Sequence, residues 1–167
     1  MNGRQIMQTF LPYANFTKSA VVLDNKRLGK QRVEAWQILN TLTGKSAGWA
    51  NHPATKMWQG YEYLLALYGI TICVEWEYRG FKDTLLPKFA EVSENLTDTG
   101  NPWWLGFEPL HISHQSNLMR KDPIHYKFGV ASNLPYIWCR PDGTFYAGPL
   151  QTTTTKGINN VSPIRAI

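Results

Sequence analysis

Apolar residues recur every three or four positions in the first part of the chain, which is the spacing of one buried helix face. The members of this series are Val21, Leu28, Ala35, Trp36, Leu39 and Leu42. The pattern predicts a helix from Thr17 or Ser19 to Thr43. Good N-cap residues at its start and a glycine directly after its end support both boundaries.

A second apolar series predicts a helix that begins at Pro53, a residue suited to the first helical turn, and ends near Arg79. The members of this series are Met57, Tyr61, Leu64, Tyr68, Ile72 and Trp76. Gly69, inside this helix, either weakens it or permits a neighbour to pack closely. A loop rich in Gly, Ser and Asn at residues 44–52 separates the first two helices.

A third helix is predicted over residues 108–121, because the Asp122-Pro123 pair that follows would end it. The rest of the chain has little helical periodicity. Extended or irregular structure is expected at residues 1–16 and 81–107, a helical turn at residues 87–92, and short strands within residues 144–154.

These elements predict a mainly α fold, with three principal helices, long irregular connections and a loop-rich C-terminal segment. The length of 167 residues suits one core, so a compact single domain is expected over residues 1–150. Residues 151–167 are expected to form a flexible tail. Met7 is an alternative start, which leaves the origin of residues 1–6 open.

The net charge of +5 favours a polyanionic partner, either a nucleic acid or an anionic membrane. No apolar run approaches the ~18 residues of a membrane span, and the N-terminus lacks the pattern of a signal peptide. We therefore expect a cytoplasmic protein with no membrane partner. Cys73 and Cys139 share no CxxC spacing and are expected to be reduced thiols.

The first predicted helix carries a polar stripe opposite its apolar face, in the sequence DNKRLGKQRVEA at residues 24–35. Arg27, Lys30 or Gln31, and Glu34 lie three or four positions apart, so they share this face. The cations, Arg32 among them, can neutralise phosphates, and they hold the one carboxylate ionised. The alternative interpretation is a solvated helix face with a weak Lys30–Glu34 pair.

Histidines and cations are concentrated in a second segment, LHISHQSNLMRKDPIHY at residues 110–126. Histidine can transfer protons near neutral pH, which makes His114 a candidate catalytic residue. His111 and His114 lack the cysteine or carboxylate neighbours that would complete a metal site, so no metal is expected. Arg120 and Lys121 either bind phosphates or complement the dipole of a helix C-terminus.

A third segment, NHPATKMWQGYE at residues 51–62, places Asn51 and His52 directly before the second predicted helix, where either residue can cap it. Trp58 and Tyr61 in this segment are more typical of a core than of a base-stacking surface. The chain contains no P-loop, no GxGxxG before a helix and no GxSxG, which argues against the corresponding nucleotide hydrolases and serine hydrolases.

Five sequence strings resemble the phage-type pyrimidine-dimer DNA glycosylase/AP-lyase family, and a bacterial branch of it in particular. The strings are TFLPY, LDNKRLGKQRVEAWQIL, NHPATKMWQGYE, PWWLG and SHQSNLMRKDPIHY, and the resemblance covers roughly residues 7–138. It implies a compact, mainly helical enzyme that bends duplex DNA and extrudes a nucleotide opposite the lesion. In this family an N-terminal α-amine attacks the sugar C1′ and forms an imine, and no cofactor is implied.

The resemblance places Glu34 on the catalytic carboxylate of the first helix, with Lys30 and His114 as further catalytic candidates. DNA is the implied partner, and the chain is expected to act as a monomer. The implied substrate-binding and DNA-binding residues are Arg27, Gln31, Arg32, Asn51, His52, Trp103, Trp104, His111, Arg120, Lys121, His125 and Tyr126. Trp103 and Trp104 are candidate wedges or pocket walls, with core packing as the alternative.

The nucleophile is where this chain departs from the family. Both Asn2 and Gln8 are bulky residues after a methionine, so removal of that methionine is not expected. An N-terminal amine, a lysine such as Lys30 and water all stay open as nucleophiles. Two further functions also stay open: a non-catalytic nucleic-acid-binding module, and an enzyme that acts on a free nucleotide or nucleoside.

Overall fold

The computed structural model describes residues 7–150, and the predictions for residues 1–6 and for a flexible tail at residues 151–167 lie outside them. The predicted mainly α fold is confirmed. The helices are α1 (Phe16–Val22), α2 (Asn25–Leu42), α3 (Pro53–Trp58), α4 (Glu62–Tyr78), α5 (Leu86–Ser93) and α6 (Glu108–Lys121), and the strands are β1 (Ile137–Cys139) and β2 (Phe145–Ala147).

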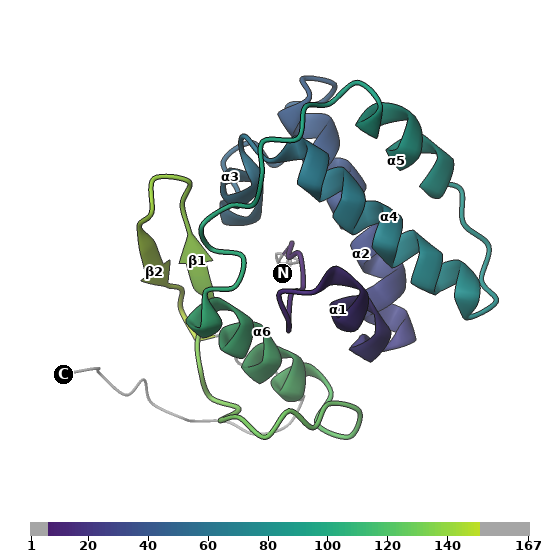
Figure 1. Ribbon diagram of the computed structural model, residues 1–167. Helices are drawn as coiled ribbons and strands as arrows, with labels where there is room; N and C mark the ends of the chain where they lie inside the picture. The colour runs from purple at the N-terminus through teal and green to yellow at the C-terminus, as the bar shows by residue number, and fades with distance from the viewer. Residues whose placement is uncertain (1–6, 151–167) are drawn as a thin grey trace.

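Helices α2 and α4 pack along each other, with α5 on the far side of α4 and α1 near its C-terminal half. Helix α6 faces them across the N-terminal segment, which runs through the middle of the molecule (Figure 1). No helix within residues 7–150 combines the length and the apolar character that crossing a bilayer requires.

The prediction of one helix from Thr17 or Ser19 to Thr43 is wrong, because the chain breaks between α1 and α2. Asp24 has extended backbone (φ −66°, ψ 158°) and caps α2, its carboxylate accepting a hydrogen bond from the main chain of Arg27. The guanidinium of Arg79 fixes the break by donating to the carbonyl oxygens of Ala20 and Leu23 at 3.1 and 2.7 Å. The continuous helix predicted from the apolar spacing places Asp24 in a helix interior, whereas this residue is the N-cap of α2.

The prediction of one helix from Pro53 to Arg79 is also wrong. Helix α3 ends at Trp58, and Gly60 takes a positive φ of 88° before α4 begins at Glu62. This left-handed turn is open to glycine without a steric penalty, so the Gln-Gly pair was the overlooked signal. Pro53 at the first turn of α3 is confirmed, with the His52 side chain as its cap.

The third helix is confirmed as α6, and the expected helical turn at residues 87–92 lies within α5. One strand, β2, falls inside the predicted residues 144–154, whereas its antiparallel partner β1 was not predicted. Trp138 of β1 is buried and pairs with Tyr146 of β2. The hairpin packs near α3 and α6.

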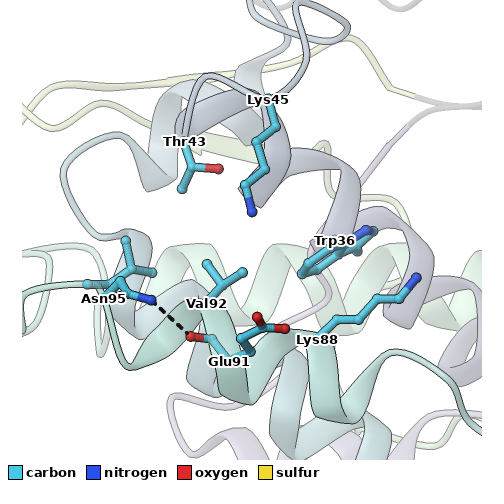
Figure 2. A pocket seen from close by; sticks show the side chains of 8 residues that line it. Trp36, Thr43, Lys45, Lys88, Glu91, Val92 and Asn95 are labelled. Atoms are coloured by element: carbon cyan, nitrogen blue, oxygen red, sulfur yellow. Dashed lines mark hydrogen bonds between the residues drawn. The ribbon is translucent and has the colours of Figure 1, made fainter.

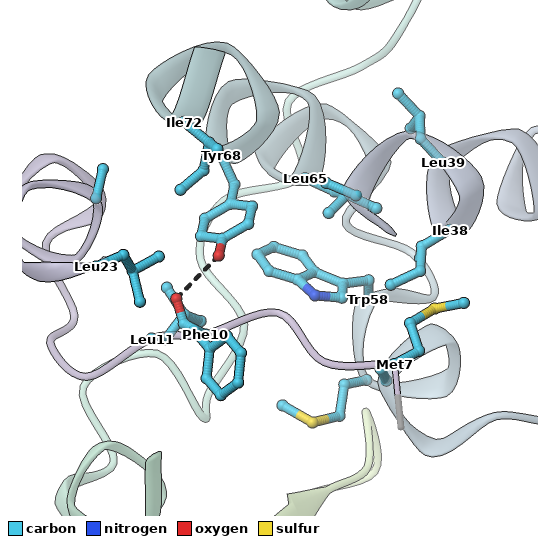
Figure 3. Packing of buried hydrophobic residues seen from close by; sticks show 14 of the residues in the cluster. Met7, Phe10, Leu11, Leu23, Ile38, Leu39, Trp58, Leu65, Tyr68 and Ile72 are labelled. Carbon is cyan, nitrogen blue, oxygen red and sulfur yellow. Dashed lines mark hydrogen bonds between the residues drawn. The ribbon is translucent and has the colours of Figure 1, made fainter. Parts of the chain in front are cut away.

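Residues 8–12 cross the core as an extended segment whose main-chain groups bond to side chains. The Gln31 side chain accepts from the main-chain N–H of Phe10 at 2.9 Å and donates to the carbonyl oxygen of Gln8 at 2.8 Å. The Tyr68 hydroxyl donates to the carbonyl oxygen of Phe10 at 2.9 Å (Figure 3). Helices α2 and α4 therefore hold the first half of the segment.

Helix α6 holds the second half of the same segment. Nδ1 of His114 accepts the main-chain N–H of Leu11 at 2.9 Å, and Nδ1 of His111 lies 2.8 Å from the carbonyl oxygen of Leu11. The Gln115 amide donates to the carbonyl oxygen of Pro12 at 2.7 Å. One turn of α6 thus satisfies three main-chain groups that would otherwise be buried without partners.

Gly69 permits close packing, which was one of its two predicted roles. A β-carbon at this position would overlap the ring of Phe89, a fully buried residue of α5 that also meets Trp36 edge to face. The missing side chain therefore sets how closely α5 approaches α4.

Gly69→Ala is expected to destabilise the protein by about 1–3 kcal/mol, because overpacking outweighs the ~1 kcal/mol that alanine gains in a helix interior. Urea unfolding measures the change. Combining it with Phe89→Leu should restore part of the loss, because the smaller side chain makes room for the added methyl group. A stabilised single variant would contradict the packing role.

Candidate functional site

Glu34 lies on the inner face of α2, with 7% of its surface exposed. Its Oε2 accepts the main-chain N–H of Gln8 at 2.9 Å and an amide N–H of Gln31 at 3.3 Å. Its Oε1 lies 3.6 Å from the ammonium of Lys30. One carboxylate oxygen is therefore fixed by the N-terminal segment, and the other faces a cation.

Burial raises the pKa of the Glu34 carboxyl above its ordinary value. The N–H of Gln8 and the charge of Lys30 act in the opposite direction, but they are outweighed by the loss of water. A carboxyl of raised pKa accepts and returns a proton more readily near neutral pH than an ordinary glutamate does. This is the behaviour expected of a group that exchanges protons with a substrate.

Two cavities meet at Glu34. The first, which we call the basic cavity, has a volume of about 170 Å³ and is lined by Phe10, Lys26, Arg27, Lys30, Gln31, Glu34 and Lys121. The second, which we call the Trp49 cavity, has a volume of about 290 Å³ and is lined by Met7, Lys30, Val33, Glu34, Gln37 and Trp49. Glu34 and Lys30 line both cavities.

The basic cavity gathers cations from two helices far apart in the sequence. Lys26, Arg27 and Lys30 come from the start of α2, and Lys121 comes from the last turn of α6. Burial lowers the pKa of Lys121, and the charges of Arg27 and Lys30 lower it further. Cations that disfavour one another in this way are stabilised by an anion placed among them, such as a phosphate.

The structure brings together five of the predicted site residues around these cavities: Arg27, Lys30, Gln31, Glu34 and Lys121. Arg27 also pairs with Asp24 at 3.1 Å, and Gln31 is fully engaged with the N-terminal segment. The remaining predicted residues lie away from both cavity linings.

Arg32 is directed toward the α4–α5 connection. Its Nε donates to the Asp83 carboxylate at 2.6 Å, and its guanidinium lies 5.0 Å from the centre of the Trp76 ring. The Asp83 carboxylate in turn accepts the main-chain N–H of Leu85 at 3.0 Å. Arg32 therefore ties α2 to this connection. The two residues are 51 positions apart in the chain, so local sequence patterns could not predict their contact.

The three histidines of the second segment make main-chain contacts. His114 is fully buried, which lowers the pKa of its imidazole to about 3, and so it stays neutral near pH 7. His111 bridges the carbonyl oxygen of Leu11 and the main-chain N–H of Gly106, which is 2.9 Å from its Nε2. Nε2 of His125 lies 3.1 Å from the carbonyl oxygen of Val22.

The aromatic candidates are also held by main-chain groups. Trp104 is fully buried and donates to the carbonyl oxygen of Met57, so it packs in the core. Trp103 is half-buried and donates to the carbonyl oxygen of Arg140 at 2.6 Å. The hydroxyl of Tyr126 accepts the main-chain N–H of Asp24 at 2.9 Å and donates to its carboxylate, which supports the start of α2.

The other predicted binding residues lie at the ends of helices α6 and α3. The guanidinium of Arg120 donates to the carbonyl oxygen of Ser132 at 2.6 Å, so it fixes the loop after α6. His52 caps α3 through Nδ1, which accepts from Ala54 at 3.1 Å, and Asn51 beside it is exposed.

Sequence reasoning placed Lys26 on the polar stripe of α2 but missed several other residues that line the two cavities: Met7, Phe10, Val33, Gln37 and Trp49. Gln37 lies on the same helix as Glu34, three positions further on, and this helical spacing could have identified it. Trp49 lies in the loop before α3, where only its aromatic character in a stretch of small and polar residues set it apart.

A larger cavity of about 580 Å³ lies apart from Glu34, between α2 and α5 (Figure 2). Trp36, Lys45, Lys88 and Glu91 are among its lining residues. It contains charges of both signs and no buried carboxylate. Its lysines therefore provide controls for those of the basic cavity.

Residues 7–87 match the model of a family described as pyrimidine dimer DNA glycosylase. The match confirms the predicted family resemblance over a segment that contains helices α1 to α4 and Glu34. No curated protein and no solved structure matches the chain significantly.

Glu34→Gln is expected to change stability in a pH-dependent way. The raised pKa means that the stability contributed by the protonated Glu34 is fully present below the ordinary value of 4.5 and is lost as the pH rises through the folded-state value. Glutamine stays neutral and can still accept the N–H of Gln8. The stability of the variant relative to the parent protein should therefore increase with pH across this window.

Urea unfolding at a series of pH values between about 4 and 8 measures this difference. Glu77→Gln, on the exposed side of α4, is the matched control and should show no such trend. A relative stability of Glu34→Gln that falls as the pH rises would contradict a raised pKa.

Proposed function

Because residues 7–87 match the model of the pyrimidine dimer DNA glycosylase family, we propose that this chain excises a damaged or modified pyrimidine from duplex DNA, with Glu34 as the catalytic carboxylate. One observation carries the proposal: a buried carboxylate of raised pKa lies beside a lysine where two cavities meet. A surface that only bound DNA would gain nothing from a carboxylate among its cations, since the carboxylate repels the negatively charged phosphates.

The two oxygens of Glu34 have separable tasks in this proposal. Oε2 is anchored by the N–H of Gln8, which fixes the orientation of the carboxylate. Oε1 is left to face the sugar of the damaged nucleotide, where it stabilises the positive charge that develops at C1′ as the glycosidic bond breaks. The departing base takes the electron pair of that bond and a proton from solvent.

Lys30 is the amine that we assign to the attack on C1′, because its Nζ lies 3.6 Å from Oε1 of Glu34. Once Lys30 has lost a proton to solvent, its neutral amine forms a bond to C1′ as the base departs, and the nitrogen then releases a proton to Glu34. Opening of the sugar ring then gives an imine and a protonated ring oxygen, with Glu34 moving the proton. The α-amine of the chain is the competing nucleophile, since the segment at Gln8 passes the same carboxylate.

The cations of the basic cavity are proposed to hold phosphates on either side of the damaged nucleotide. Lys26, Arg27 and Lys121 lie around the cavity in positions that leave Glu34 at its edge. Phosphate contacts of this kind position the duplex and make binding depend on salt. A duplex offers phosphates on both sides of the nucleotide, whereas a free nucleotide offers phosphate at one position, so the duplex engages more of these cations.

Glu34→Gln is expected to lower the rate of base release from dimer-containing duplex DNA by about 10²- to 10⁴-fold, while duplex binding is retained, because the substitution removes proton transfer and charge stabilisation but keeps the shape. Borohydride trapping on abasic duplex DNA measures imine formation, and peptide mapping of the trapped adduct locates the amine. An adduct at Lys30 supports the assignment of Lys30 as the nucleophile. An adduct at the chain terminus would instead identify the α-amine as the nucleophile.

Equal base release by Glu34→Gln and the parent protein would contradict a catalytic role and leave Glu34 as a support for the N-terminal segment. Absence of both base release and trapping across several modified substrates would overturn the glycosylase itself. Salt-sensitive duplex binding in that case would identify a non-catalytic module.

Lys121→Ala is expected to weaken duplex binding and to reduce the slope of log affinity against log salt by about 1, because one phosphate contact is lost. Lys88→Ala, which removes a lysine from the α2–α5 cavity, is the control and should leave the slope unchanged. Fluorescence anisotropy over a range of salt concentrations gives both slopes. Equal slopes for Lys121→Ala and the parent protein would remove Lys121 from the DNA contact.

A further inference from the structure

Trp49 combines two properties that core packing does not explain. Its backbone has a φ of 66°, and it is the only non-glycine residue within 7–150 with a positive φ. This left-handed conformation is costly for a bulky residue and persists only where the surroundings impose it. Yet 44% of the residue is exposed, so burial of the indole offsets little of that cost.

The loop that carries Trp49 is held by contacts that do not use the indole. The hydroxyl of Thr41 donates to the carbonyl oxygen of Gly48, and the main-chain N–H of His52 donates to the carbonyl oxygen of Trp49 at 3.0 Å. The loop is thus held without the side chain of Trp49, and we attribute the strained backbone to the placement of the indole.

The indole itself is oriented by a row of aromatic rings. Its centre lies 5.6 Å from that of His52, with the two planes at 80°, and His52 meets Trp138 at 5.9 Å and 84°. His52 is in turn fixed by its bond to the main chain of Ala54. Because these contacts are edge to face, no ring among the described residues stacks in parallel on the indole.

The walls of the Trp49 cavity have the chemistry that a nucleobase requires. Val33 and Met7 supply apolar surface, the Gln37 amide supplies a donor and an acceptor, and Glu34 lies at the junction with the basic cavity. Its volume of about 290 Å³ is at the small end of the range for ligand sites, which suits a single ring system.

We infer that the Trp49 cavity binds one unstacked nucleobase of the bound DNA, with the indole of Trp49 as its stacking surface. The inference rests on the proposed function, because it places an unstacked base next to Glu34, the carboxylate proposed to act on the sugar. Aromatic stacking accepts any base, so Trp49 supplies affinity for an unpaired base rather than discrimination among bases.

A cycle of two DNA duplexes and two proteins tests the inference without any chemical step. One duplex carries a single bulged adenine, and the other carries an uncleavable tetrahydrofuran residue, which has no base, at the same bulge. Fluorescence anisotropy gives the affinity of each duplex for the parent protein and for Trp49→Ala. The parent protein is expected to prefer the adenine bulge, and Trp49→Ala to lose about 5- to 100-fold on that duplex alone.

Trp49→Phe should recover most of the preference, since phenylalanine retains a stacking face. Tyr78→Ala removes an exposed aromatic side chain at the end of α4 and should leave the preference unchanged. An equal loss on both duplexes in Trp49→Ala, or no preference in the parent protein, would overturn the inference. Because neither duplex is cleaved, a failure of base excision leaves this result readable, and the two proposals can fail separately.

Discussion

The buried main chain of residues 8–12 is the constraint on which the rest of the structure depends. No strand within residues 7–150 pairs with this extended segment, so its N–H and C=O groups must bond to something else, because a buried group left unpaired costs about 1–3 kcal/mol. Here side chains of α2, α4 and α6 supply the partners. Polar residues that would be anomalous in a core, such as Gln31 and His114, are there to meet this demand.

The proposed site is a part of the same network. Glu34 belongs to the set of side chains that satisfy the segment, and the bond from Gln8 to its Oε2 decides which way its other oxygen faces. A carboxylate in this position loses hydration when it is buried, and its raised pKa reflects that cost. A neutral amide such as Gln31 carries no charge and avoids this cost. Retaining a charge where a neutral group would bond equally well is typical of sites whose chemistry needs the charge.

Helical periodicity predicted the mainly α fold and the position of α6, since that helix has clear signals at both ends. It failed at Asp24 and Gly60, where a cap and a left-handed turn interrupt an otherwise continuous apolar pattern. Such interruptions are short, so a pattern averaged over many residues passes over them.

The polar stripe of α2 predicted Arg27, Lys30, Gln31 and Glu34 as neighbours, because residues on one helix face stay together in any fold. It could not separate Arg32 from them, since the partner of Arg32 is Asp83, in the connection between α4 and α5. Two of the clustered histidines presented the same difficulty: the role of His111 and His114 is set by Leu11, about a hundred positions away.

That separation also fixes an order of events during folding. Leu11, in the second half of the segment, meets its partner His114 on α6 only after 103 further residues have been synthesised. Contacts that close so long a loop form late, after the local helices exist. The segment that orients Glu34 is therefore held at both of its halves only when α6 has been made and packed, so a nascent or truncated chain lacking α6 would have the helix of the site with only half of the support of this segment.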